Sequence, residues 1–148
     1  VISVNNGIVN AILNRYSSET DKEGVSLHIK GQLPEECYID AFDLCTIFSN
    51  LLSNAFEAAK KSEEKCIEVE CGYTTDMIFI IIQNDYSGNI QGSDGKFLTG
   101  KSNKEYHGFG LQNIERSVEK YSGNMNIEVN KKFAVRIRMM NKICEGKK

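Results

Sequence analysis

Hydrophobic positions recur at helical spacing most clearly between residues 43 and 59. The apolar positions in that segment are Leu44, Ile47, Phe48, Leu51, Leu52, Ala55, Ala58 and Ala59. Asn50 and Asn54 stand four positions apart and therefore share a face of the expected helix, which Glu57 continues one turn later. Asn forms helix poorly, so two of them in mid-helix indicate either amides placed for a ligand or simply a polar helix edge.

Periodicity also predicts two further helices and five strands. A helix is expected from Val1 to about Ser18, with Val4, Ile8, Ile12 and Tyr16 on one stripe and Val9 and Leu13 beside it. Another helix is expected over 111–121. Strands are expected over 25–30, 66–73 and 77–83, and as a terminal hairpin over 125–129 and 133–139. The run over 77–83 is continuously apolar, which is typical of a central strand covered on both faces. Together these elements predict an α+β fold, a two-layer α/β sandwich in which a mixed, mostly antiparallel sheet packs on about three helices.

The connections between these elements are polar. Asp40 or Asp43 is expected to cap the helix over 43–59, which ends near Lys60. Residues 17–24 form a predicted connection, and residues 141–148 a predicted frayed tail. Residues 89–110 contain five glycines and no regular period, so we expect a long functional loop, disordered over 88–106 in the free protein.

Composition limits the classes of function. The 148 residues suit a single domain, and a net charge of -2 gives no general basic surface, so nucleic acid is not an expected partner. No apolar run approaches the roughly 20 residues of a membrane span. Because the chain begins at Val1, we expect it to be a fragment of a longer protein. Its five cysteines show no CxxC spacing and only two histidines accompany them, so we expect reduced thiols in a cytosolic setting and no zinc site.

Two polar segments stand where ligand sites commonly occur. Asn84 and Gly88 come directly after the apolar strand over 77–83. At the far end of the long loop, residues 107–111 read His-Gly-Phe-Gly-Leu and lead into the last helix. A glycine-rich turn at a helix N-terminus is a physical means of holding phosphate, and it also occurs as simple turn chemistry.

These segments, in this order, resemble the GHKL superfamily of ATP-binding domains, which have the Bergerat fold. Residues 50–55, Asn-Leu-Leu-Ser-Asn-Ala, resemble its N box, and residues 107–111 resemble its glycine box. Asn84-x-x-x-Gly88 stands where the superfamily has Asp-x-Gly-x-Gly. More narrowly, the chain resembles quorum-sensing receptor histidine kinases of the accessory-gene-regulator type, which also tend to show Gly-Lys-Phe-Leu-Thr, here residues 95–99.

The resemblance implies that the domain binds ATP and Mg²⁺. Asn54 would coordinate Mg²⁺ bridging the ATP phosphates, and Asn50, one turn earlier, would support the metal or the phosphates. Asn84 would recognise adenine through its amide, and Gly88 would let the base approach the backbone. The altered adenine motif, with Asn84 and Tyr86 in place of Asp and Gly, leaves the affinity for ATP open.

The same resemblance implies roles for the long loop. Residues 89–106 would form the ATP lid, from which Lys101 would neutralise phosphate charge. Gly108 and Gly110 would shape the turn that offers backbone N–H groups to the phosphates. Leu111 belongs to the same motif, although a neutral side chain there suits packing. His107 would either contact phosphate or order the lid.

As the catalytic domain of a two-component sensor histidine kinase, the chain would supply the γ-phosphate of ATP to a histidine on a dimerisation hairpin that it does not contain. Neither His28 nor His107 lies on such a hairpin. The resemblance implies a homodimeric, membrane-anchored receptor with this domain in the cytoplasm and a response regulator as partner. Two alternatives stay open: a nucleotide-sensing or degenerate regulatory module, and a serine kinase of the anti-sigma-factor type, against which Asn50 argues because no carboxylate stands there.

Overall fold

A computed structural model describes residues 2–87, 96–98 and 108–142. Three helices and six strands occur in these residues. They are α1 (Gly7–Lys22), β1 (Ser26–Gly31), α2 (Ala41–Lys60), β2 (Cys66–Tyr73), β3 (Met77–Asn84), β4 (Lys96–Leu98), α4 (Gly108–Glu119), β5 (Asn124–Val129) and β6 (Phe133–Met140).

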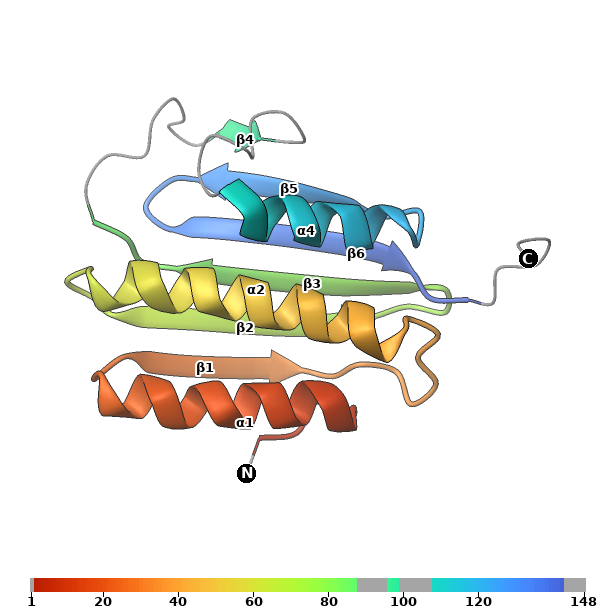
Figure 1. Ribbon diagram of the computed structural model, residues 1–148, viewed down its shortest axis with the longest axis horizontal. Coiled ribbons are helices and arrows are strands. Elements are labelled where there is room, and N and C mark those ends of the chain that lie inside the picture. Colours follow the sequence, from red (N-terminus) through yellow and green to blue (C-terminus); the bar gives the residue numbers. More distant parts are fainter. Residues whose placement is uncertain (1, 88–95, 99–107, 143–148) are drawn as a thin grey trace.

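The strands form one sheet in the order β1-β2-β3-β6-β5-β4, and the three helices lie along one face of it (Figure 1). β1 runs parallel to β2 because α2 carries the chain back across the sheet, whereas every other pair is antiparallel. The side chains of the helices and the facing side of the sheet form one core. The predicted two-layer α+β sandwich with a mixed, mostly antiparallel sheet is therefore confirmed.

The first helix differs from its prediction at both ends. α1 begins at Gly7 because the side chain of Asn6 accepts hydrogen bonds from the backbone N–H groups of Ile8 and Val9. It continues to Lys22, so the polar connection predicted over 17–24 is mostly helix. The predicted apolar positions are wrong only at Ile8, which is 40% exposed. The other predicted positions are buried or pack partly buried against the core: Val4, Val9, Ile12, Leu13 and Tyr16. Thr20, which lies beyond the predicted helix, is buried as well.

The second helix agrees closely with its prediction. Asp40 caps α2 by accepting a hydrogen bond from the backbone N–H of Phe42. The buried apolar positions of α2 are Leu44, Ile47, Phe48, Leu51, Leu52, Ala55 and Ala59. Ile114 and Val118 of α4 are fully buried as well, and the two helices pack against each other. This packing brings the N-terminal turn of α4 beside the middle of α2.

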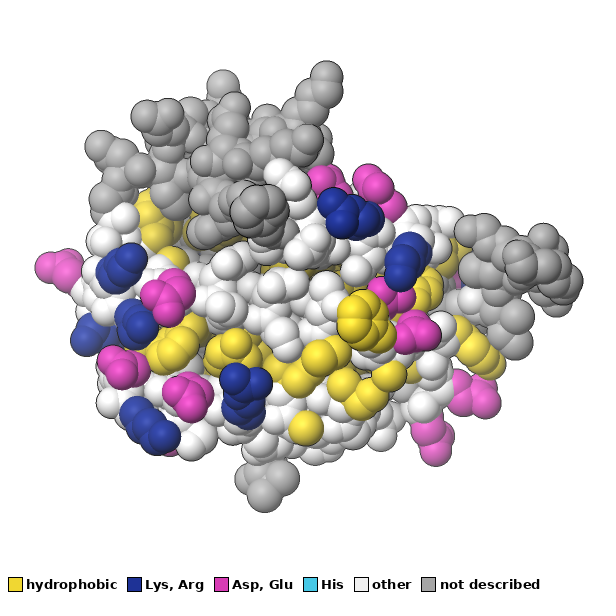
Figure 2. Space-filling view, viewed as in Figure 1, with side chains coloured by type: hydrophobic (Ala, Val, Ile, Leu, Met, Phe, Trp, Pro, Cys, Tyr) yellow, Lys and Arg dark blue, Asp and Glu magenta, His cyan; other side chains and the backbone are white. Residues whose placement is uncertain are grey.

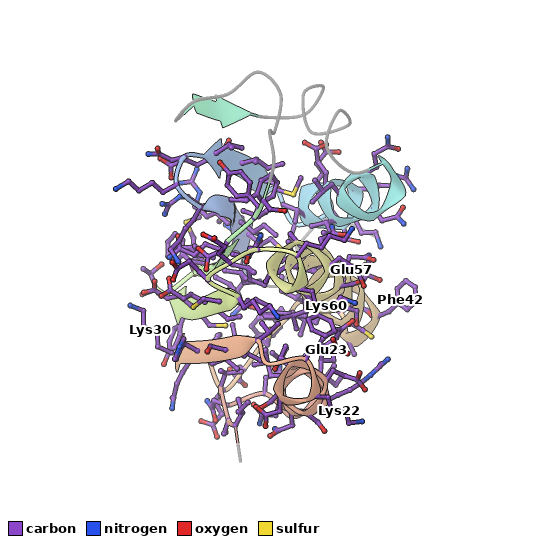
Figure 3. The ribbon with its side chains drawn as sticks, turned by 90° about the vertical axis from the view of Figure 1, so that its left-hand side faces the viewer. Lys22, Glu23, Lys30, Phe42, Glu57 and Lys60 are labelled. Atoms are coloured by element: carbon purple, nitrogen blue, oxygen red, sulfur yellow. The ribbon has the colours of Figure 1, made fainter. Side chains whose placement is uncertain are left out.

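The central strand β3 is not covered on both faces, contrary to the prediction from its apolar run. Its residues alternate between buried and half-buried, with Ile78, Ile80 and Ile82 toward the helices. No helix of the described residues lies on the opposite face, where Lys30 of β1 points away from the helix layer (Figure 3). A six-stranded sheet with helices on one side only leaves the alternate side chains of its centre partly in water.

The segment after β6 is anchored at its start. Asn141 is 6% exposed, and its side-chain oxygen accepts a hydrogen bond from the backbone N–H of Tyr38 while its amide donates to the carbonyl of Glu36. Its backbone N–H donates to the carbonyl of Asp76. The frayed tail predicted from residue 141 is therefore wrong for Asn141, and residues 143–148 lie outside the described residues.

Candidate functional site

Asn54 and Gly110 face each other between α2 and α4. A methyl group built on Gly110 would lie 3.3 Å from Nδ2 and 3.6 Å from Oδ1 of Asn54. The Nδ2 atom is buried and has no hydrogen-bond partner among the described residues. A buried donor without a partner costs free energy, and an acceptor brought by a ligand would remove that cost. The contact unites the two predicted motifs, the N box and the glycine box, in one place.

The other polar residues predicted on α2 divide into two groups. Asn50 is half-buried, like Asn54, and lies one turn before it on the same helix. Glu57 is exposed and forms an ion pair with Lys60, with 3.3 Å between its Oε2 and the Nζ, on the solvent side of the helix layer (Figure 3). Glu57 therefore does not join the half-buried amides.

The glycine box forms the start of α4, which begins at Gly108. Leu111 is 1% exposed and belongs to the hydrophobic core, so its side chain packs under the helix. The first N–H groups of an α-helix have no partner within the helix, and the positive end of its dipole lies there. The start of α4 beside Asn54 is consequently suited to an anion.

Asn84 ends β3 on the helix side of the sheet and is 3% exposed. Its Nδ2 donates a hydrogen bond of 2.9 Å to the backbone carbonyl of Asp85. This hydrogen bond fixes the orientation of the Asn84 side-chain amide. Its oxygen has two lone pairs and is the atom that an exocyclic amine of adenine would require.

Asp85 was not singled out by the sequence reasoning. It is 7% exposed, and its Oδ1 lies 3.2 Å from Nζ of Lys132 in the β5–β6 turn. Its Oδ2 is buried without a hydrogen-bond partner among the described residues. Partial burial acts to lower the pKa of Lys132, but the hydrogen bond and the charge of Asp85 outweigh it and raise that pKa. No periodic signal marks this residue, because it lies two positions beyond the apolar run over 77–83.

Asp43 was predicted only as an alternative cap, yet it is 3% exposed. Its Oδ1 lies 3.0 Å from Nζ of Lys120, and its Oδ2 accepts a hydrogen bond from the hydroxyl of Tyr121. Burial, followed by the hydrogen bond to Asp43, raises the pKa of Tyr121 to about 12. The sequence does carry a signal for this residue: Asp43 stands four positions before Ile47, on the buried stripe of the helix.

Several predicted site residues lie outside the described residues. They are Gly88, Lys101 and His107, together with residues 89–95 and 99–106 of the predicted lid. Within the lid, Lys96–Leu98 forms strand β4 and pairs with β5, so a loop without regular structure over the whole of 89–110 is not what the chain forms. An edge strand of three residues gives too short a pattern to be recognised in a glycine-rich segment.

The residues present fit a nucleotide with its metal. Asn54 offers an amide to Mg²⁺ or to a phosphate oxygen, and the two amide atoms can exchange places by rotation of the group. Among the described residues, no three His, Cys, Asp or Glu side chains gather to hold a metal ion. A Mg²⁺ ion that keeps its waters and phosphate ligands needs few protein oxygens, and one or two amides meet that need.

Comparison with protein families gives one decisive match. The family model described as GHKL domain matches residues 39–140, which is more than half of the chain. The chain belongs to the GHKL domain family. The match begins just before α2 and ends at β6, so it includes Asn54, Asn84 and Gly110. A comparison with curated protein sequences gave no match.

Solved structures of histidine kinases share the fold. The nucleotide-free catalytic domain of histidine kinase ThkA superposes with a TM-score of 0.70 at 13% identity, covering 90% of this chain and 91% of that one. Histidine kinase AdeS of Acinetobacter baumannii gives 0.65 at 13% identity, covering 92% of this chain and 64% of AdeS. Full-length ShkA in complex with AMPPNP gives 0.68 at 12% identity, covering 97% of this chain and 31% of ShkA. This GHKL domain therefore has the fold of histidine kinase catalytic domains.

Within the described ranges, none of the helices combines the length and apolar character that a membrane span requires. The four cysteines that the structure describes, Cys37, Cys45, Cys66 and Cys71, are free thiols.

Proposed function

We propose that this GHKL domain is the ATP-binding catalytic domain of a two-component sensor histidine kinase. In this proposal it supplies the γ-phosphate of Mg-ATP to a histidine on a separate dimerisation hairpin. The observation that carries the proposal is the buried, unpartnered Nδ2 of Asn54 facing Gly110 at the start of α4. A bound triphosphate would satisfy that donor and the first N–H groups of the helix, which have no partner within the helix itself.

Each side of the site has a separate task. The start of α4 and Asn54 hold the phosphates, with Gly108 and Gly110 allowing close approach of the backbone. Asn84 accepts from the adenine amine through its side-chain oxygen, at the end of β3. Asn54, and Asn50 as a second candidate, would hold Mg²⁺, which neutralises phosphate charge during transfer. Gly88, Lys101, His107 and the lid over 89–106 complete the proposed site.

The wider assignment is part of the same proposal. The domain would occupy the cytoplasmic side of a membrane-anchored, homodimeric receptor of the accessory-gene-regulator type. Its partners would be the phosphoacceptor hairpin of that receptor and a response regulator. Phosphoryl transfer depends mainly on positioning and on charge stabilisation, so a domain that holds ATP rigidly supplies its half of the reaction.

Calorimetric titration with a non-hydrolysable ATP analogue, with and without Mg²⁺, tests the proposal. Wild type should bind with a dependence on Mg²⁺, and Asn54→Ala should bind at least about tenfold more weakly because a hydrogen bond to a charged group is lost. Ser53→Ala is the matched control, since Ser53 is the exposed neighbour on the same helix. Absence of binding up to millimolar analogue would refute the kinase assignment and favour a regulatory module that lacks nucleotide.

A further inference from the structure

Helices α2 and α4 meet at two polar contacts, one toward each end of their interface. Asn54 faces Gly110 at one contact, and Asp43 binds Lys120 and Tyr121 at the other. Eleven positions separate Asp43 from Asn54, and eleven separate Gly110 from Tyr121. Equal spacing in opposite chain directions means that the two helices run antiparallel in a fixed register.

The spacing also places Asp43 and Asn54 on one side of α2. Eleven residues make about three turns of α-helix and span ~16 Å, so Asp43 and Asn54 point in nearly the same direction. Tyr121 lies in the turn directly after α4, which ends at Glu119, and its backbone N–H donates to the carbonyl of Val118 in the last turn of that helix. The interface between the contacts is apolar, since Ile47, Ile114 and Val118 are fully buried.

The contact at Asp43, which we call the Asp43 clamp, consists of Asp43, Lys120, Tyr121 and Asp40. Asp43 is 3% exposed and uses both carboxylate oxygens, one on the Lys120 ammonium and one on the Tyr121 hydroxyl. The Tyr121 hydroxyl also accepts a hydrogen bond of 2.9 Å from the backbone N–H of Asp40, the cap of α2. The end of α4 is thereby bonded to the first turn of α2 through directional contacts.

We propose that the Asp43 clamp is a positioning device that sets the register of α4 against α2 and so holds the glycine turn at Asn54. Apolar packing is not directional, and a slide of one residue would move Gly110 by about 1.5 Å along the helix axis. Such a slide would turn another position of α4 toward Asn54. The consequence for nucleotide binding rests on the proposed function, whereas the register itself does not.

Hydrophobic side chains are exposed near the Asp43 clamp, and none of the predicted nucleotide contacts belongs to it. Phe42, next to Asp43, is 75% exposed and projects from α2 into solvent on the helix side (Figure 3). Hydrophobic side chains on this face of the molecule form a broken band across its middle (Figure 2). None of the clamp residues is among the predicted nucleotide contacts, so a change there affects a ligand at Asn54 only through the helices.

Two variants and a control test the proposal. Tyr121→Phe removes only the hydroxyl, and Asp43→Asn removes the charge with little change of shape. Ile29→Val in β1 is the control, because Ile29 packs partly buried against the core in a strand whose main contacts are α1 and β2 rather than α2 and α4. Each protein is titrated with the non-hydrolysable ATP analogue and Mg²⁺, and NMR spectra of the nucleotide-free protein record the Asn54 side-chain amide and the Gly110 backbone amide.

The clamp variants should bind the analogue about tenfold more weakly, and the control should bind like wild type, since mutations along a coupled network change binding by such factors. The Asn54 and Gly110 signals should move in both clamp variants and stay in place in the control. Unchanged affinity in the clamp variants would overturn the positioning role, even if the signals move. If wild type binds no nucleotide, the proposed function fails, and the NMR signals alone decide: moved signals support the register device and unmoved signals overturn it.

Discussion

Replacing Gly110 by Ala should separate nucleotide binding from stability. The new methyl group would lie 3.3 Å from Nδ2 of Asn54, a tight contact with a side chain that can shift by a few tenths of an ångström. Ala is favoured over Gly by about 0.8–1.0 kcal/mol inside a helix, and by less in a first turn. The two effects oppose each other, so we expect the free energy of unfolding to stay the same or rise by about 0.5 kcal/mol.

Binding should respond differently to the same change. The methyl group occupies the space beside the unpartnered Nδ2, through which Asn54 would donate to a phosphate. A hydrogen bond to a charged group contributes about 1.5–3 kcal/mol, which corresponds to at least about tenfold in Kd. Gly110→Ala should therefore fold as well as wild type and bind the ATP analogue at least about tenfold more weakly.

Urea unfolding and calorimetric titration measure the two quantities on one sample. Gly7→Ala is the matched control, because Gly7 starts α1 and a methyl group there meets nothing within 4 Å. It should share any gain in helix stability and leave the Kd unchanged. Wild-type affinity in Gly110→Ala, or a loss of more than about 1 kcal/mol of stability, would refute this reasoning about the Asn54 contact.

Three other predictions concern the fold. Gly31→Ala should destabilise the protein by more than about 2 kcal/mol in urea unfolding. The backbone at Gly31 has φ +92, and the added methyl group would collide with the Cys71 carbonyl oxygen of the neighbouring strand. A smaller loss of stability would mean that β1 separates easily from β2. An alkylating reagent at pH 8 should label exposed Cys45 before buried Cys71, since burial, followed by the charge of Glu70, raises the pKa of the Cys71 thiol to about 12. Mass spectrometry that finds Cys71 labelled as early as Cys45 would contradict this. The raised pKa of Tyr121 means that the folded protein holds this proton more tightly than the unfolded chain. This proton therefore contributes its full stabilisation below about pH 10, and the contribution disappears as the pH rises to about 12. In urea unfolding, the stability difference between wild type and Tyr121→Phe should shrink over that range. A constant difference would contradict the raised pKa of Tyr121.

The fold was largely predictable because most elements carry a strong period. α2 and the terminal hairpin β5–β6 have apolar positions at 3.6 and 2.0 residue spacing, and their bounds agree closely with expectation. The two ends of α1 were misplaced, because its start depends on the Asn6 cap and because the buried residue near its end is a threonine, Thr20. The apolar run of β3 indicated burial on both faces, but a run cannot show how many layers cover a sheet.

The site was predictable from motifs and only partly from chemistry. The expectation that Asn54 and the glycine turn meet needs the resemblance, since no spacing rule joins residues 54 and 110. The buried ion pairs of Asp43 and Asp85 were not predicted because acidic residues are usually exposed. Their partners Lys120 and Lys132 also lie more than 40 positions away in the sequence. Charge pairing across such a separation is a property of the tertiary fold.

The equal spacing between the two contacts of α2 and α4 limits how the length of this chain can vary. One residue inserted between Asp43 and Asn54 would rotate everything beyond it by about 100° and break one contact or the other. A second insertion in α4 would make the two spacings equal again, but the apolar faces of the two helices between the contacts would no longer match. Loops and hairpin turns outside this span are free of that condition. Length changes among functional relatives of this domain should therefore fall in the connections and leave these two eleven-residue intervals intact.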